Sequence, residues 1–208
     1  MKGKFAKKFF YFLALIGIVE SFGILVYQSV KRTQNTKQIL ADDNTQYLLL
    51  GIGFLFFRPY VLLPLLPFAL FSLFHVLAYT KGHLLPIYGL ADSSYSTRIG
   101  HFISQNNTKS IELASFLEIV SLGHLFLRVL FLRKRSLFIF ILYVVFIKLR
   151  FEKSVFTRNY FKKIELHIEK LVNNTGNPNV KNVWVNVKSN VKKLDNFSLV
   201  HNYKEKNT

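Results

Sequence analysis

Long apolar runs alternate with basic segments along this chain, and that segregation restricts what the chain can fold into. The first run, Phe9 to Val30, contains 22 residues and a single charged side chain, Glu20. A helix of this length, at about 1.5 Å per residue, crosses a hydrocarbon core of roughly 30 Å. The formal net charge of +17 accompanies a hydrophobic fraction of 50%. Together these features predict a helical integral membrane protein with basic flanks.

The first run could also be read as a secretory signal peptide, because four lysines precede it between positions 2 and 8. The run is longer than a usual signal core, however, and Glu20-Ser21-Phe22 makes a poor small-residue cleavage site. We therefore expect an uncleaved signal anchor.

Three further apolar segments follow. Residues 47–79 contain Pro59, Pro64 and Pro67 and predict one kinked helix, with a re-entrant first half as the alternative. Residues 80–112 are mixed and turn-rich and form the largest gap between apolar segments. Residues 113–132 and 136–147 are the last two segments, and the final one is short for a full crossing.

From position 148 onward the chain becomes basic and amphipathic. Residues 148–208 hold 13 basic and 5 acidic side chains, a net charge of +8. Apolar residues recur at helical spacing in two stretches separated by Asn173 to Pro178, which predicts two helices within 153–195. Residues 196–208 are polar and predict a disordered tail.

The two amphipathic helices could pack on each other or on the bundle, bind nucleic acid, or lie on an anionic membrane surface. The surface interpretation fits best, because aromatic apolar faces opposite Lys and Arg are what interfacial insertion requires. Nucleic acid is disfavoured because the charge lies beside membrane segments. The predicted membrane-binding residues are Phe156, Arg158, Tyr160, Lys162, Lys163, Ile164, Ile168, Lys181, Trp184, Val187, Lys188 and Val191.

No pattern in the sequence predicts an enzyme or a cofactor. The chain has no cysteine, its six histidines lack metal-ligand spacing, and it contains no Gly-rich phosphate loop or nucleophile elbow. Four ionisable groups nevertheless lie within apolar segments: Glu20, His75, Glu118 and His124. We interpret them as hydrogen-bonding partners between helices; the rival interpretation is an ion or small-solute pathway.

The distribution of basic clusters bears on topology. Four crossings would place both Lys-rich ends in the cytosol, as the positive-inside rule favours. They would also place Arg133-Lys134-Arg135 on the opposite side, against that rule. A shallow hairpin would put this turn within the membrane, at a higher cost, and three crossings would separate the two basic ends. The sequence therefore leaves the number of crossings open. At the carboxyl end, Lys204 and Lys206 resemble the dilysine retrieval signal of endoplasmic-reticulum membrane proteins.

A block in the middle of the chain resembles the central signature of the transmembrane protein 33 family. The block runs from Pro59-Tyr60-Val61 through the Phe-Ser-Leu-Phe-His run at 71–75 to Tyr79-Thr80-Lys81. Tyr47-Leu48-Leu49, Leu149-Arg150-Phe151 and Arg158-Asn159-Tyr160 also match, so the resemblance covers roughly residues 45–172. It implies a multipass protein of the endoplasmic reticulum and nuclear envelope, associated with nuclear pore distribution and sheet–tubule organisation. The resemblance carries over no catalytic residues.

These observations predict an all-α integral membrane protein with about four membrane segments and C-terminal interfacial amphipathic helices. The expected parts are a membrane domain (1–147, with segments at about 9–30, 47–79, 113–132 and 136–147), basic amphipathic helices (148–195) and a tail (196–208). The expected function is structural, contributing to membrane curvature and nuclear pore complex distribution; the alternative is a channel or carrier subunit. Expected partners are anionic lipids, nuclear pore components, reticulon-like membrane-shaping proteins and an import receptor.

Overall fold

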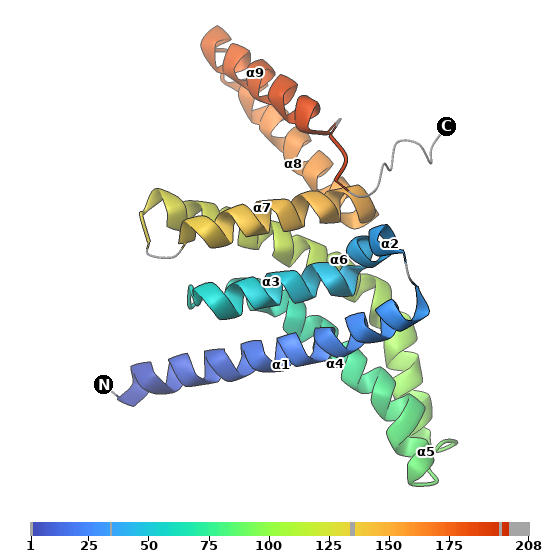
Figure 1. The fold of residues 1–208 in the computed structure, drawn as a ribbon. Helices are drawn as coiled ribbons and strands as arrows, with labels where there is room; N and C mark the ends of the chain where they lie inside the picture. The colour runs from blue at the N-terminus through green and yellow to red at the C-terminus, as the bar shows by residue number, and fades with distance from the viewer. Residues whose placement is uncertain (1, 34, 134–135, 196, 200–208) are drawn as a thin grey trace.

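The chain folds into a bundle of helices from which a helical hairpin projects (Figure 1). The computed structural model describes residues 2–33, 35–133, 136–195 and 197–199, with the backbone alone at positions 2–4, 37, 194 and 195. Within these residues every regular element is helical, so the predicted all-α fold is confirmed. The elements are α1 (Lys2–Arg32), α2 (Thr36–Ala41), α3 (Asp43–Phe57), the 3₁₀ turn η1 (Leu63–Leu65), α4 (Leu66–Tyr79), the π turn η2 (Thr80–Leu84), α5 (Leu85–Ile87), α6 (Ser94–Leu130), α7 (Ser136–Lys153), α8 (Val155–Asn174) and α9 (Pro178–Asp195).

Three helical stretches in the described chain are long and apolar enough to cross a membrane: Phe5–Arg32, Leu63–Ile87 and Ser94–Leu130. The 37 residues of α6 extend about 55 Å, so this helix exceeds the thickness of a hydrocarbon core. Helix α3 has only 15 residues, and α7 has 18 with four charged side chains in its last six positions. The segment predicted at 136–147 therefore lies within a helix that is short for a full crossing.

Residues 47–79 do not form one kinked helix, and that prediction is wrong. Helix α3 ends at Phe57, where Arg58 adopts a left-handed conformation (φ 44°) and donates its backbone N–H to Phe54 O at 2.9 Å. Pro59 cannot continue a helix, and Tyr60 is also left-handed (φ 53°). The chain consequently reverses, and α4 runs back from the end that α3 has reached (Figure 1).

The turn-rich interpretation of residues 94–112 is also wrong, because these residues form the first half of α6. Ser93 caps the helix, its hydroxyl accepting a hydrogen bond from Ser96 N at 3.3 Å. Beyond that cap the sequence contains no proline as far as Leu130, so nothing interrupts the helical ladder. The apolar residues of the sequence identified only the second half of this helix, from residue 113 onward.

The reversal after α3 changes which loops share an end of the bundle. Lys8 Nζ lies 5.4 Å from the Tyr60 ring centroid, and Arg128 donates to Pro59 O (3.1 Å) and to Ser136 Oγ (3.3 Å). The first turns of α1, the 58–60 turn, the end of α6 and the start of α7 therefore meet. We name this region the basic end. Arg133 follows α6 here, at the same end of the bundle as the start of α1.

The opposite end joins the other termini of the same helices. Ser29 Oγ donates to Asp42 Oδ2 at 2.8 Å, which ties the end of α1 to the cap of α3. Lys153 Nζ at the end of α7 donates to Ala41 O at 2.9 Å. Helices α1, α3 and α7 thus lie side by side, with the amino terminus at one end and the α7–α8 junction at the other (Figure 1).

Candidate functional site

Two features of the structure are candidates for function: the α8–α9 hairpin and a charge cluster buried inside the bundle. Ser154 caps α8 by accepting a hydrogen bond from Thr157 N at 3.3 Å. Gly176, with φ 62°, makes the turn after α8, and Asn177 Oδ1 accepts from Asn179 N at 2.9 Å to begin α9. Two helices with a break at this position are what the apolar spacing predicts.

One lysine of α9 bridges to two carboxylates of α8. Lys188 Nζ of α9 lies 2.7 Å from Glu165 Oε1 and 2.7 Å from Glu169 Oε1 of α8. Hydrogen bonds to these two carboxylates raise the pKa of the Lys188 ammonium above its ordinary value of 10.5. The three side chains lie at the surface, so the bridge fixes how the helices pair more than it stabilises them.

Apolar side chains of the hairpin remain uncovered. Val183 is 63% exposed and Val191 58% exposed, and Ile164, Leu171 and Val187 are also exposed. The hairpin runs at a steep angle to α1, α3 and α7 and lies outside the bundle (Figure 1). An amphipathic surface in this position can bury its apolar side chains in the boundary between lipid head groups and acyl chains.

The structure separates the predicted membrane-binding residues into two groups. Arg158, Tyr160 and Lys188 make contacts within the chain: Arg158 Nη1 donates to Phe151 O (3.0 Å) and Glu152 O (3.1 Å), and the Tyr160 hydroxyl donates to Glu112 Oε1 of α6 (3.4 Å). Burial and the neighbouring Glu112 carboxylate raise the pKa of Tyr160.

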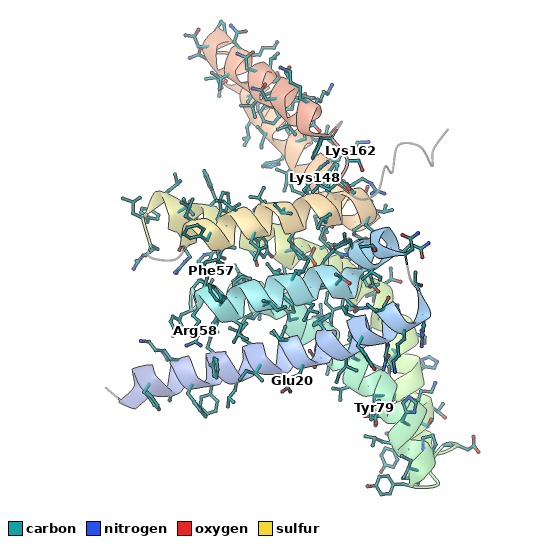
Figure 2. All side chains as sticks on the ribbon, viewed as in Figure 1. Glu20, Phe57, Arg58, Tyr79, Lys148 and Lys162 are labelled. Atoms are coloured by element: carbon teal, nitrogen blue, oxygen red, sulfur yellow. The ribbon has the colours of Figure 1, made fainter. Side chains whose placement is uncertain are left out.

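The other predicted residues lie on the hairpin without such bonds to the bundle. Lys162, Lys163, Lys181, Ile164, Val187 and Val191 are exposed, and Phe156, Ile168 and Trp184 are half-buried. Figure 2 shows Lys162 near the base of the hairpin. Lys204 and Lys206, the predicted retrieval signal, lie outside the described residues.

The buried charge cluster joins α3, α6 and α7. Glu118 of α6 is 0% exposed and Arg150 of α7 is 3% exposed, and Arg150 Nε lies 3.3 Å from Glu118 Oε2. Arg150 Nη1 also lies 3.0 Å from Asp43 Oδ1, and Lys153 Nζ lies 3.1 Å from the same atom. The cluster therefore runs from the buried Glu118–Arg150 pair to Asp43 and Lys153, whose side chains are 44% and 42% exposed, and its two cations balance its two carboxylates.

Tyr47 connects the cluster to the aromatic core. Its hydroxyl donates to Glu118 Oε1, and its ring centroid lies 5.1–5.4 Å from the rings of Phe22, Phe68, Phe71 and Phe146. The Tyr143 hydroxyl donates to Glu118 O at 3.2 Å. Each polar contact of Glu118 therefore comes from a helix other than its own, which makes this residue a junction between helices.

The structure does not bring the four predicted intramembrane ionisable groups together. Glu118 is paired as described, whereas Glu20 and His75 are exposed and His124 is half-buried. Figure 2 shows Glu20 on the side of α1 away from α3. None of the four lines the cavity between α1 and the 58–60 turn or the one beside Leu73 and Phe102. The interpretation of Glu118 as an interhelical hydrogen-bonding group agrees with this geometry.

Sequence reasoning did not identify Arg150 and Asp43 as the partners of Glu118. A signal existed for Arg150, because Ile139, Tyr143 and Phe146 precede it at helical spacing and all four are buried on one face of α7. An arginine that continues an apolar face requires an acidic partner, and Glu118 is the acid within the neighbouring apolar segment.

Comparison with known proteins agrees with this architecture. The profile of a family described as "Transmembrane protein 33/Nucleoporin POM33" matches residues 2–196. The chain is 31% identical to "Nucleoporin POM33" of Chaetomium thermophilum, in an alignment that covers 88% of this chain and 72% of that protein. It is 30% identical to "Tetra-spanning protein 1" of Schizosaccharomyces pombe (91% and 74% covered) and 28% identical to "Pore membrane protein of 33 kDa" of Saccharomyces cerevisiae (92% and 76% covered). No solved structure matches the chain significantly. The family match over nearly the whole chain, together with the apolar helical bundle, shows that this multipass membrane protein belongs to the transmembrane protein 33/nucleoporin POM33 family.

Proposed function

We propose that this chain is a structural membrane protein of the endoplasmic reticulum and nuclear envelope. In this role it contributes to membrane curvature and organisation and to the distribution of nuclear pore complexes. The observation that carries the proposal is the α8–α9 hairpin, whose apolar side chains are exposed beside basic ones at the edge of a membrane bundle. The names of the relatives, which describe pore membrane proteins, support the compartment.

The hairpin acts as a wedge in one leaflet. Lys162, Lys163 and Lys181 are exposed and attract anionic head groups, each with about 1 kcal/mol. The exposed valines of α9 enter the same leaflet and displace lipid there, which favours curvature. In this proposal residues 1–147 anchor the protein, and residues 148–195 act on the surface of the bilayer.

The same basic surface is available to protein partners. An import receptor would compete with lipid for the exposed lysines of the hairpin, whereas nuclear pore components and reticulon-like membrane-shaping proteins would contact the assembled membrane protein. Lipid is the primary partner in this proposal, because the exposed apolar side chains require an apolar surface to cover them.

A peptide of residues 153–195 tests the membrane role. It should be largely unstructured alone and become helical on anionic liposomes, because a short amphipathic helix needs a surface for its apolar face. The gain in helicity should weaken as salt is added, since salt screens the attraction to the head groups. Trp184, the only tryptophan in the chain, should shift its emission to the blue on binding.

Two substitutions separate insertion from charge attraction. Trp184→Asp should weaken binding more than Lys181→Gln, because it places a charge among the apolar side chains. A peptide that stays disordered on anionic liposomes, or that binds neutral liposomes equally well, would contradict the proposal.

Ion flux through reconstituted protein above that of empty liposomes would favour the channel interpretation instead.

A further inference from the structure

A cavity of about 180 Å³ opens at the basic end, between α1 and the turn that follows α3. Aromatic side chains form most of its lining: Phe5, Phe9, Tyr11 and Phe12 from α1, and Tyr60 from the turn. Phe5, Phe9 and Tyr60 are themselves exposed, so the cavity communicates with the surface of the bundle. It therefore offers an apolar, accessible wall beside the start of a membrane-crossing helix.

Two cations complete the lining of this cavity. Lys8 Nζ lies 5.4 Å from the Tyr60 ring centroid, and Arg58 Cζ lies 4.9 Å from that of Phe12. The left-handed backbone of Arg58, followed by Pro59, fixes its position at the end of α3, and Figure 2 shows it facing α1. Neither cation makes an ion pair with a carboxylate in the described part of the chain.

The surroundings of the cavity carry charge of one sign. The segments that meet at the basic end, 5–15, 57–62, 125–133 and 136–140, contain five Lys and Arg and no Asp or Glu. The opposite end differs, because Arg150 and Lys153 pair with Asp43 and Lys148 pairs with Glu152. Positive charges beside an apolar surface raise the local concentration of anions at the basic end.

We propose that this cavity binds an anionic phospholipid, with the negatively charged head group on Lys8 and Arg58 and the glycerol and upper acyl chain against the aromatic side chains. The position of the cavity along α1 favours a lipid over a soluble anion. The cavity lies where Lys7 and Lys8 precede the apolar run from Phe9 to Val30, and we place this boundary at the depth of the head groups in a bilayer. Basic pockets between membrane helices bind acidic head groups in this way.

This site is distinct from the α8–α9 hairpin. Its lining comes from α1 and the 58–60 turn at one end of the bundle, whereas the hairpin follows the other end of α7. The hairpin would distort one leaflet, while the cavity would hold single lipid molecules. The two can therefore be tested separately in the full-length protein.

Photo-crosslinking in vesicles tests the site directly. The full-length protein is reconstituted in phosphatidylcholine vesicles with a diazirine-bearing phosphatidylserine, or with the same probe on a phosphatidylcholine head group. Irradiation, proteolysis and mass spectrometry then map the crosslinks. The serine lipid should label residues 5–15 and 58–62 more strongly than the choline lipid does.

Substitutions of the two cations should lower this labelling. Lys8→Gln and Arg58→Gln should each reduce serine-lipid crosslinks at 5–15 and 58–62 about fivefold. Lys31→Gln is the matched control, because Lys31 is exposed on the same helix and lies over a tyrosine ring at 4.6 Å, but at the other end. That control should leave the labelling unchanged, and none of the three should alter crosslinks within 155–193.

Three results would overturn the proposal: equal labelling of 5–15 by both head groups, no effect of Lys8→Gln and Arg58→Gln, or an equal effect of Lys31→Gln. Circular dichroism shows whether each variant keeps its helices. If Arg58→Gln lowers helicity, Lys8→Gln decides alone, since Lys8 is exposed on α1 and its charge can be removed without touching the core.

Discussion

Replacing Arg150 by methionine should destabilise the bundle strongly, because it leaves the Glu118 carboxylate buried without its cation. Glu118 is 0% exposed, and its carboxylate would keep only the hydrogen bond from the Tyr47 hydroxyl, because Tyr143 donates to the backbone carbonyl of Glu118. Removing one partner of a buried pair costs about 3–5 kcal/mol. For a chain of this size that corresponds to a fall of about 6–20 °C in Tm.

A substitution of Glu118 leaves no buried charge without a partner and removes hydrogen bonds instead. In Glu118→Leu, Arg150 keeps its contact with Asp43 at 3.0 Å, while Arg150 Nε and the buried Tyr47 hydroxyl lose their acceptor. In the double variant Glu118→Leu/Arg150→Met, Asp43 keeps Lys153 at 3.1 Å and no charge remains buried alone. The double variant should therefore be more stable than Arg150→Met.

Thermal unfolding of the four proteins in detergent, followed by circular dichroism at a helix band, measures these differences. Arg98→Met provides the control, because Arg98 is an exposed arginine on α6 outside the cluster, and Tm should not change. Additive losses in the double variant would refute the coupling between Glu118 and Arg150. An Arg150→Met protein as stable as the unmodified chain would refute the buried pair itself.

Four further outcomes follow from the geometry. Tyr47→Phe should cost about 1.5–3 kcal/mol in thermal unfolding, because it removes the hydrogen bond to buried Glu118 but keeps the ring packing. The pairing of α8 with α9 should be complete at neutral pH and lost as the pH rises through the raised pKa of Lys188, above 10.5; Trp184 emission should report this, and Lys188→Gln should abolish the transition. Protease sites placed before α1 and after α9 should be cut from opposite sides of sealed microsomes, and cleavage of both from one side would show an even number of crossings, as when α7 alone does not traverse the bilayer. Carbonate extraction should leave the chain in the membrane pellet, because its three long apolar stretches are integral to the bilayer, and release into the supernatant would contradict this.

The sequence by itself determined the membrane class and the character of the carboxyl-terminal helices. Runs as long as Phe9 to Val30 do not fit a water-soluble globular fold, because such a helix has too few polar residues to face water. The 3-and-4 spacing of apolar residues in 153–195, with the Gly176–Pro178 break, predicted two amphipathic helices that the structure forms as α8 and α9. These conclusions depend on properties of one helix at a time, which periodicity records directly.

Only the tertiary structure decided how those helices meet. Left-handed Arg58 and Tyr60 reverse the chain within a region whose apolar residues and prolines predicted one kinked helix, and neither residue is a glycine that would have signalled a left-handed turn. Glu118 and Arg150 are 32 positions apart and pair only because α6 and α7 pack side by side. The basic end likewise arises from the assembly of distant segments. Spacing along a sequence specifies which face of a helix is apolar, but the approach of two faces depends on packing between helices, which no single segment encodes.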